Sequence, residues 1–436
     1  MTASDLRAEI LDLVRRYHHE AHAPARFVPG RTRVTYAGRV FDGDELVGLV
    51  ASALDFWLTA GPCAAEFETR VRRLFGAERF LLVNSGSSAN LVMLSALRSR
   101  QFEDALAPGD EVVTPSVTFP TTLTPILQNQ LVPVFVDCRI GTYNVDPARI
   151  EDALGPRTRA IFVPHTLGNP CDMATIMDVA TRHDLVVLED ACDALGATYA
   201  GRQVGTFGAM ASLSFYPAHH ITMGEGGGVV VNDARLARIA LSLRDWGRDC
   251  WCEPGHSDTC GNRFSGRHGE LPPGYDHKYV YSNIGYNLKV TDLQAAIGLA
   301  QLDKLDTFVS ARRANFAYYY ERLLPLADRL VLPEWEPEAE PSWFGFPITC
   351  AAAGEAEALV RHLESAQIET RKVFAGNILR QPGFLDIPHR VHDTLANADE
   401  IMRRTFFIGV YPGLTDEMRE YVVRCILAFY GAEAAD

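Results

Sequence analysis

Short apolar runs alternate with helix-like stretches through the middle of this 436-residue chain, and this alternation restricts its fold more than any other feature. The runs recur over residues 80–231 and read FLLVN, EVVTP, VPVFVD, AIFVP, LVVLED, SLSFY and GVVVN. Helical patterns lie between them, including residues 88–100 and 174–183. Continuous apolar runs are typical of strands buried on both faces, so the pattern predicts an α/β domain with a mostly parallel sheet covered by helices.

Three parts are expected along the chain. They are an N-terminal helical extension (1–40), a large domain (41–310) that includes a loop rich in Gly, Pro, His and Cys (247–286, the Cys-rich loop), and a small C-terminal α/β domain (311–436). An amphipathic helix at residues 1–24 is predicted to begin the first part. A long helical pattern at residues 291–324 is expected to carry the boundary between the two domains, and WFGFPITC is predicted as a strand of the smaller one. Further helices are predicted over residues 233–246, 353–366 and 415–430.

Charge and composition exclude several classes of function. The net charge of −14 disfavours nonspecific binding to nucleic acid. No uncharged apolar run reaches the roughly 18 residues of a membrane span, and the first residues do not read as a signal peptide. Nine cysteines, an odd number, favour a reducing compartment. We therefore expect a cytoplasmic enzyme that binds neither nucleic acid nor membrane.

A serine-rich turn, NSGSSAN, follows the first apolar run and opens a predicted helix. Its small side chains, hydroxyls and free backbone N–H groups at the positive end of a helix suit a phosphate. Gly86 and Ser87 lie at its centre. Such turns also cap helices for purely structural reasons, so this segment alone leaves both interpretations open.

Asp190 ends the run LVVLED, at the sheet edge where open α/β proteins bind their ligands. A carboxylate at this position can pair with a protonated pyridine nitrogen and make that ring a better electron acceptor. The alternative is a helix N-cap aspartate. About two dozen residues later comes SFYPAHHITMGEGGG, whose glycines predict a tight turn into the strand GVVVN.

The order of these motifs resembles that of the DegT/DnrJ/EryC1/StrS family of sugar aminotransferases. GYNLK and DLQAAIGLAQL complete the match, which spans residues 41–305. The resemblance implies the pyridoxal-phosphate-dependent transferase fold of the aspartate aminotransferase type, and a homodimer with active sites at the subunit interface. It also implies cofactor-binding roles for seven residues. These are Gly86, Ser87 and Ser214 for the phosphate, Phe119 stacking on the ring, Asp190 for the ring nitrogen, Asp193 near the ring hydroxyl, and Asn287 reaching the phosphate of the other subunit.

His219 stands where the family's aminotransferases have the lysine that binds the cofactor covalently, five residues after Ser214. Imidazole cannot form that Schiff base, but it is a competent general base near neutral pH. The amine form of the cofactor, pyridoxamine 5′-phosphate (PMP), suits such a site because it brings its own nucleophile for a ketone. His219 is therefore predicted to be the catalytic base. At Asp193, relatives often have Gln or His, so its contact with the cofactor is open.

Three cysteines, Cys250, Cys252 and Cys260, crowd into the Cys-rich loop. Thiolates this close together repel one another unless a metal centre neutralises them, and four cysteines are the usual set for an iron–sulfur cluster. With Cys192 as the fourth ligand they form the pattern C-x57-C-x-C-x7-C. This pattern resembles that of the PMP- and [2Fe-2S]-dependent 3-dehydrases of nucleotide-linked 4-keto-6-deoxyhexoses. A structural zinc ion is the alternative.

Two histidines of the same loop, His256 and His268, could compete as ligands, although solvated loop positions are expected for both.

The resemblance implies reductive removal of the sugar's C3 hydroxyl. PMP forms an adduct with the C4 ketone, His219 removes a proton from the cofactor's C4′, the C3 hydroxyl leaves, and the cluster delivers electrons to give a 3-deoxy sugar. No GxGxxG follows a strand, so a separate NAD(P)H-dependent flavin and iron–sulfur reductase is expected as the donor. Lys278, Arg403 and Arg404 are weak candidates for binding the substrate diphosphate.

Two other functions remain open from the sequence. One is a cluster-free 3-dehydratase that takes its amine from an amino acid. The other is a non-catalytic relative in which the cysteines hold structural zinc.

Overall fold

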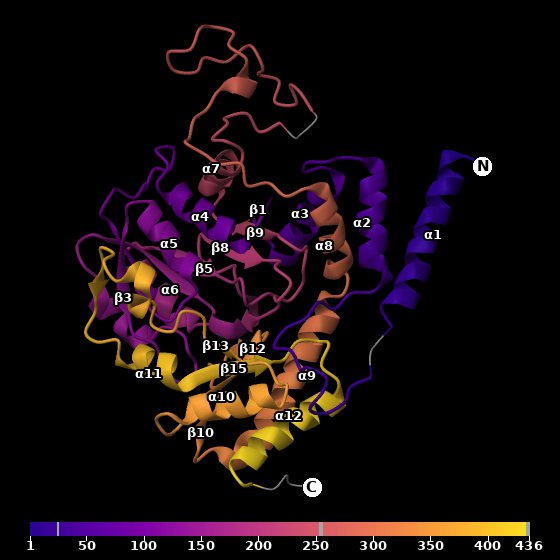
Figure 1. The fold of residues 1–436 in the computed structure, drawn as a ribbon. Coiled ribbons are helices and arrows are strands. Elements are labelled where there is room, and N and C mark those ends of the chain that lie inside the picture. Colours follow the sequence, from indigo (N-terminus) through magenta and orange to yellow (C-terminus); the bar gives the residue numbers. More distant parts are fainter. Residues whose placement is uncertain (24–25, 253–255, 433–436) are drawn as a thin grey trace.

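The computed structural model describes residues 1–23, 26–252 and 256–432. Its centre is a mixed eight-stranded sheet with the order β1-β9-β8-β5-β4-β2-β3-β14 (Figure 1). The strands are β1 (Arg79–Val83), β2 (Glu111–Pro115), β3 (Val132–Val136), β4 (Thr158–Pro164), β5 (Val186–Asp190), β8 (Met210–Ser214), β9 (Gly227–Val231) and β14 (Arg390–Val391). The seven apolar runs of residues 80–231 are all strands, so the predicted α/β sheet is confirmed.

The middle of this sheet is parallel, and one edge is antiparallel. Strands β3, β2, β4, β5 and β8 run in the same direction, whereas β9 pairs antiparallel with both β8 and β1. The register aligns Pro164 of β4 with Asp190 of β5, and Asp190 with Ser212 of β8. The carboxyl ends of the parallel strands therefore meet along one edge, which places the segments after β4, β5 and β8 side by side.

Helices cover both faces of the sheet. On one face α4 (Gly86–Leu97), α5 (Pro120–Gln128) and α7 (Ala234–Arg244) bury their apolar side chains, and on the other α3 (Pro62–Phe75), α6 (Met173–Arg182) and α8 (Asp292–Leu302) do so. The predicted helices at residues 88–100, 174–183 and 233–246 correspond to α4, α6 and α7. Burial of both sheet faces explains why the strands read as continuous apolar runs.

The single helix predicted over residues 291–324 is wrong, because two helices occupy this segment. α8 ends at Leu302, and α9 (Leu305–Leu323) begins after a break at Asp303 and Lys304. The Lys304 ammonium lies 2.7 Å from the Glu45 carboxylate of α2 (Gly43–Asp55). Neither Gly nor Pro marks this break, whereas tertiary ion pairs of Asp303 and Lys304 accompany it.

The C-terminal part forms a second sheet with the order β10-β12-β15-β13. Its strands are β10 (Leu330–Val331), β12 (Gly345–Cys350), β13 (Arg371–Lys372) and β15 (Thr405–Gly409), and its helices are α10 (Glu355–Ser365), α11 (Ala396–Arg404) and α12 (Asp416–Phe429). Several contacts tie this part to the rest of the chain, among them two backbone pairings. β14 joins the large sheet beside β3, and Val34 of the N-terminal extension pairs with Ile368.

The remaining elements are short or peripheral. Helix α1 (Ala3–Ala21) packs on α2 and has no buried residue; the predicted helix end at Pro24 lies outside the described residues. β6 (Thr198–Tyr199), β7 (Arg202–Gln203) and β11 (Ala339–Glu340) form a three-stranded sheet. None of the helices in the described part of the chain is both long enough and apolar enough to cross a bilayer.

The Cys-rich loop projects from the body of the molecule beyond α7 (Figure 1). Two backbone bridges close its base, one between Asp245 and Asn287 and one between Arg248 and Tyr281. A single short 3-10 turn, η4 (His277–Tyr279), lies within its described part. Residues 253–255, which the predicted cysteine pattern spans, lie outside the described residues.

Candidate active site

A pocket lies at the carboxyl ends of β4, β5 and β8. It gathers seven of the predicted site residues from separate parts of the chain: Gly86, Ser87, Phe119, Asp190, Asp193, Ser214 and His219. Cys192 lines the same pocket. The strand-end motifs thus meet in one cavity, because the parallel register brings these ends together.

The start of α4 forms the predicted phosphate cradle. Ser85 is the N-cap, and its hydroxyl accepts a hydrogen bond from the Ser88 backbone N–H. A Cβ atom on Gly86 would stand only 2.7 Å from both the Cys192 Sγ and the Ser214 Cβ, so glycine is required for this close approach. The Ser87 hydroxyl donates to Thr121 at 2.9 Å. Free N–H groups and hydroxyls therefore face the pocket at the positive end of a helix.

The Asp190 carboxylate is 7% exposed and accepts four hydrogen bonds. Asn90 and Thr122 donate to one oxygen, at 2.9 and 2.7 Å. The Ser212 hydroxyl and the Cys192 backbone N–H donate to the other, at 3.1 and 3.2 Å. This arrangement holds the carboxylate in a fixed orientation, as a partner for a protonated ring nitrogen requires.

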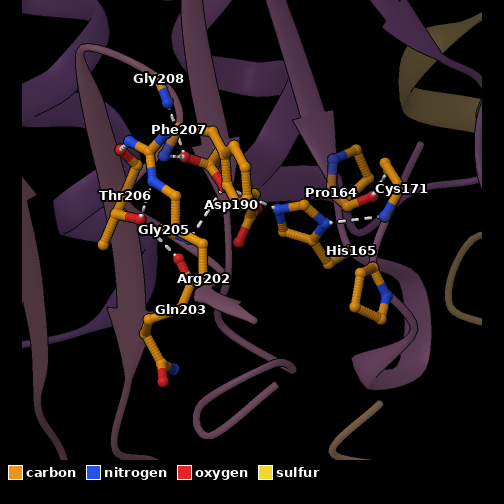
Figure 2. A network of polar contacts seen from close by, with 12 residues as sticks. Pro164, His165, Cys171, Asp190, Arg202, Gln203, Gly205, Thr206, Phe207 and Gly208 are labelled. Atoms are coloured by element: carbon orange, nitrogen blue, oxygen red, sulfur yellow. Dashed lines mark hydrogen bonds and ion pairs between the residues drawn. The ribbon is translucent and has the colours of Figure 1, made fainter. Parts of the chain in front are cut away.

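A fully buried pair, His165 and Glu189, supports the strand ends behind Asp190 (Figure 2). The His165 Nδ1 accepts the backbone N–H of Cys171, so its Nε2 carries the proton and donates to Glu189 at 3.1 Å. Glu189 also accepts backbone N–H groups from Gly205, Phe207 and Gly208. The polar network fixes β5 relative to the 202–208 turn.

His219 lies in the turn between β8 and β9 and projects into the pocket. Burial lowers its pKa to about 4, and the charge of the buried Arg312 acts in the same direction. Its Nδ1 lies 3.4 Å from the Asp193 carboxylate and has no hydrogen bond to any of the described residues. Near pH 7 the imidazole is therefore neutral, which is the form that can accept a proton.

Asp193 is held in its neutral form as well. Burial raises its pKa to about 8, and the negative charge of Asp190 adds to this effect. On the other side of His219, the Phe344 ring lies 5.3 Å away between ring centroids, and the Arg312 guanidinium binds the His219 backbone carbonyl at 3.0 Å. His219 is thus positioned by its backbone and by an aromatic neighbour.

Reasoning from the sequence did not identify two basic residues that line the pocket, Arg371 and Lys372 of β13. The weak candidates for the substrate diphosphate lie elsewhere. Lys278 contacts the backbone of His256 within the Cys-rich loop, whereas Arg403 and Arg404 pair with Glu400, and none of them lines the pocket. No sequence motif marks β13 as part of the pocket, because only the tertiary fold places it there.

Two further predicted residues have different environments. Phe119 is 52% exposed within the pocket, and its ring makes an edge-to-face contact with the ring of Phe374. Asn287 is exposed, accepts a hydrogen bond from Lys289 and does not line the pocket of its own chain. Its predicted role at a second subunit stays a prediction.

The three cysteines of the Cys-rich loop lie together. Burial opposes ionisation of Cys252, but hydrogen bonds from Thr259, Cys250 and Cys260 outweigh it and lower the Cys252 pKa to about 6. Cys250 and Cys260 also lie within 4.8 Å of a ring nitrogen of His277. Three thiols and an imidazole are a donor set that fits an iron–sulfur or zinc centre.

Cys192 is not part of this group. Burial raises its pKa well above the usual value, with Asp190 adding to the shift, and its Sγ lies 3.5 Å from the Ser212 hydroxyl. Neither potential metal-binding group of the described residues includes it. Of the loop histidines, His256 is exposed, whereas His268 is half-buried and stacks on His277.

A phosphate cradle, an exposed aromatic ring and a buried carboxylate in one pocket fit a pyridoxamine or pyridoxal phosphate. The comparisons with known proteins define the same class. A solved structure of the Escherichia coli GDP-4-keto-6-deoxy-D-mannose-3-dehydratase with bound hydrated PLP superposes with a TM-score of 0.82 at 29% identity, covering 90% of this chain and 99% of that one. The fold is therefore that of the PLP-dependent aminotransferases, as the sequence predicted.

Residues 42–427 match the DegT/DnrJ/EryC1/StrS aminotransferase family, and the chain belongs to it. It is 53% identical to a dTDP-4-dehydro-2,6-dideoxy-D-glucose 3-dehydratase of Saccharopolyspora spinosa over 428 residues, 98% of this chain and 92% of the relative. It is also 49% identical to a lipopolysaccharide biosynthesis protein, RfbH, of Salmonella typhimurium, over 99% of both chains.

Proposed function

We propose that this protein removes the C3 hydroxyl of a nucleotide-linked 4-keto-6-deoxyhexose, with PMP as cofactor and an iron–sulfur cluster as the electron carrier. The observation that carries the proposal is His219. By the family resemblance it stands where the aminotransferases have their lysine, and it lines the same pocket as Gly86, Ser87 and Asp190. The similarity to a sugar 3-dehydratase over nearly the whole chain supports the same reaction class.

Different residues of the pocket bind different parts of the cofactor and the substrate. The N–H groups at the start of α4 and the hydroxyls of Ser87 and Ser214 bind the cofactor phosphate, Phe119 stacks on the ring, and Asp190 pairs with the ring nitrogen. When bound, PMP supplies the amine that condenses with the sugar ketone and a ring that accepts electron density. Arg371 and Lys372 are the pocket's cations for the substrate diphosphate.

His219 acts as the general base. Its neutral imidazole accepts the proton from C4′ of the cofactor, and the same proton can then be donated to the departing C3 hydroxyl, which leaves as water. Asp193, protonated near pH 7, lies beside the ring at 3.4 Å and can donate a hydrogen bond to it or to the cofactor. Because hydrogen bonds alone retain the cofactor, no lysine is needed at the position of His219.

The reductive step belongs to the Cys-rich loop. Cys250, Cys252 and Cys260 hold the cluster, and Cys192 is the fourth ligand that the sequence predicts. When bound, a [2Fe-2S] cluster would supply one-electron transfer, and the two electrons would come from NAD(P)H through a separate flavin and iron–sulfur reductase. We propose a homodimer as the working form, in which the exposed Asn287 reaches the phosphate of the neighbouring subunit.

A cluster-free 3-dehydratase is the second candidate, and the likeness to the Escherichia coli enzyme supports it. Such an enzyme would take its amine from glutamate and need no reductase. Iron and acid-labile sulfide analysis of anaerobically purified protein separates the two. Iron-free protein that is fully active with glutamate would rule out the reductive proposal.

Isotope exchange tests the role of His219. Wild-type protein incubated with PMP and substrate in heavy water is expected to gain deuterium at C4′ of the cofactor, and His219→Asn is expected to lose this exchange by about 10²–10⁴-fold. Exchange that survives in the variant would assign the base to another residue. Turnover against CDP- and TDP-linked 4-keto-6-deoxyhexoses, with a reductase and NADH, then identifies the substrate. A protein that shows neither exchange nor turnover would be the non-catalytic relative.

A further inference from the structure

Arg312 of α9 is a buried cation close to His219. The residue is 2% exposed, and its guanidinium binds backbone carbonyls rather than any carboxylate of the described residues. Its Nε has no hydrogen bond to any part of the chain that the structure describes. Burial lowers the pKa of Arg312 to about 10, against the attraction of Asp193, so the guanidinium still carries its charge near pH 7. Burying an unpaired charge destabilises a folded protein, so stability alone does not account for this residue.

The guanidinium links two segments of the active site. Its Nη2 donates to the carbonyl of His219 at 3.0 Å. Its Nη1 lies 3.2 and 3.3 Å from the carbonyls of Trp343 and Phe344, which lead into β12. His220 adds a second link, because its Nε2 donates to the Ser342 carbonyl at 2.8 Å. The turn that carries His219 is thus joined to the segment that carries Phe344.

These contacts determine where the imidazole of His219 lies. The Phe344 ring is 5.3 Å from it between ring centroids. The backbone N–H of Phe344 donates to the Leu167 carbonyl at 2.8 Å, so the segment before β12 is itself anchored to the turn after β4. Arg312 therefore holds the base at the junction of three segments, and a shift of its guanidinium would move both the His219 backbone and the aromatic ring beside it.

The charge of Arg312 also acts on the imidazole. Burial is the main cause of the low pKa of His219, about 4, and Arg312 acts in the same direction whereas Asp190 opposes it. A fixed positive charge disfavours the imidazolium, so it keeps the base neutral before it accepts a proton and favours release of that proton afterwards. The charged and titratable groups around the ring are Asp190 and Asp193 of β5 and the segment after it, His220 of the same turn, Arg312 of α9, and Arg371 and Lys372 of β13.

We propose that Arg312 is the positioning residue of the catalytic base: its guanidinium fixes the backbone of His219 and Phe344 and presents a permanent positive charge to the imidazole. Arg312 does not line the pocket, so it touches neither cofactor nor substrate. It gains and loses no proton, because the proton moves from C4′ of the cofactor to His219 and from there to the departing hydroxyl. The inference rests on the proposed function in that His219 is the base.

Three substitutions in the full-length protein separate the two effects of Arg312. Arg312→Met removes both the charge and the hydrogen bonds, whereas Arg312→Lys keeps the charge but loses the planar fork that reaches several carbonyls. Arg313→Met is the matched control, because Arg313 of the same helix also binds backbone carbonyls, those of Pro341, Gly196 and Glu340, but makes no contact with the turn of His219. Equilibrium titration is expected to give wild-type affinity for PMP in all three variants.

The first measurement is the titration of His219 in cofactor-free protein, by NMR of ¹³C-labelled histidine, with His219→Asn identifying the signal. The midpoint is expected to rise by about 1 pH unit in Arg312→Met. It should stay at the wild-type value in Arg313→Met, and also in Arg312→Lys, because a buried lysine is protonated at the acid pH of this titration. The second measurement is deuterium exchange at C4′. It is expected to slow about tenfold or more in both Arg312 variants, which lose the fork, and to keep the wild-type rate in Arg313→Met.

A wild-type midpoint together with wild-type exchange in Arg312→Met would overturn the assignment and leave the proposed function standing. Absence of exchange in the wild type, with the midpoint still shifted in Arg312→Met, would do the reverse. If Arg312→Met does not fold, Arg312→Lys decides the question. Exchange about tenfold slower at wild-type PMP affinity supports the positioning role, and exchange at the wild-type rate contradicts it.

Discussion

In the cofactor pocket the reactive groups stand on the ends of buried strands, whereas in the Cys-rich loop they stand on a segment that projects from the body (Figure 1). Asp190 accepts four hydrogen bonds and rests on the buried His165–Glu189 pair. Cys250, Cys252 and Cys260 are held by one another, by His277 and by the two bridges at the base of the loop. The large sheet fixes the first site, whereas contacts among the thiols and the imidazole hold the second together.

The two sites are therefore expected to respond differently to change. The pocket is part of the folded large domain. The packing and hydrogen bonds of that domain therefore set the pocket's geometry before any cofactor binds. The Cys-rich loop buries few apolar side chains, so the proposed metal centre would contribute directly to its order. If the two sites are independent, a substitution in one of them should abolish the function of that site and leave the function of the other intact.

The largest difference between the effects on the two sites is expected for Cys252→Ser. Loss of one thiolate removes the cluster, so formation of the 3-deoxy product should fall to background. Deuterium exchange at C4′ should remain at the wild-type rate, because the pocket and His219 are unchanged. Product analysis and exchange on the same preparation check this. Loss of both activities together would mean that the loop also shapes the pocket.

A second test compares two histidine–glutamate pairs. His165→Ala leaves the buried Glu189 carboxylate without one of its donors and the Cys171 N–H without its acceptor, so a loss on the order of 3 kcal/mol is expected. His183→Ala removes the exposed partner of Glu151 and should leave the unfolding midpoint at its wild-type value. Denaturant unfolding measures both. Equal effects would contradict the claim that the buried pair supports the pocket.

Gly86→Ala tests the close approach in the phosphate cradle. The added Cβ would meet Cys192 and Ser214 at 2.7 Å, so the cradle must widen, and PMP affinity is expected to fall about tenfold. Gly383→Ala is the matched control, because nothing lies within 4 Å of its Cβ position. Equilibrium titration with PMP gives both affinities. An unchanged affinity in Gly86→Ala would place the phosphate elsewhere.

The sequence predicted the pocket well because its residues follow strands in a parallel sheet, where order along the chain determines position in space. Asp190, Ser214 and Gly86 could be found in this way. Arg371 and Lys372 could not, since a second sheet carries them to the pocket from over 150 residues further along the chain. The break between α8 and α9 was missed for a similar reason, because neither Asp303 nor Lys304 is a helix breaker.

In the Cys-rich loop the sequence identified the cysteines but not their neighbour. Cys250, Cys252 and Cys260 are close along the chain, so their proximity follows from spacing alone. His277 comes 17 residues after Cys260, and the turn at Asp276 that returns it to the three thiols has no periodicity. The family resemblance implies Cys192 as the fourth ligand, whereas the folded loop places the imidazole of His277 beside Cys250 and Cys260.

The smallest effect is expected from the ionisation of Asp193, which changes the stability of the cofactor-free protein with pH. Because burial raises its pKa to about 8, the folded protein binds a proton that the unfolded chain releases near pH 4, and wild-type stability falls as the pH rises between these values. Asp193→Asn has no such proton, so its melting temperature should exceed that of the wild type by a few degrees at pH 8. The difference should shrink toward pH 4, where both side chains are neutral. Thermal unfolding at several pH values checks this, and a difference that grows toward low pH would show that Asp193 is ionised in the folded pocket.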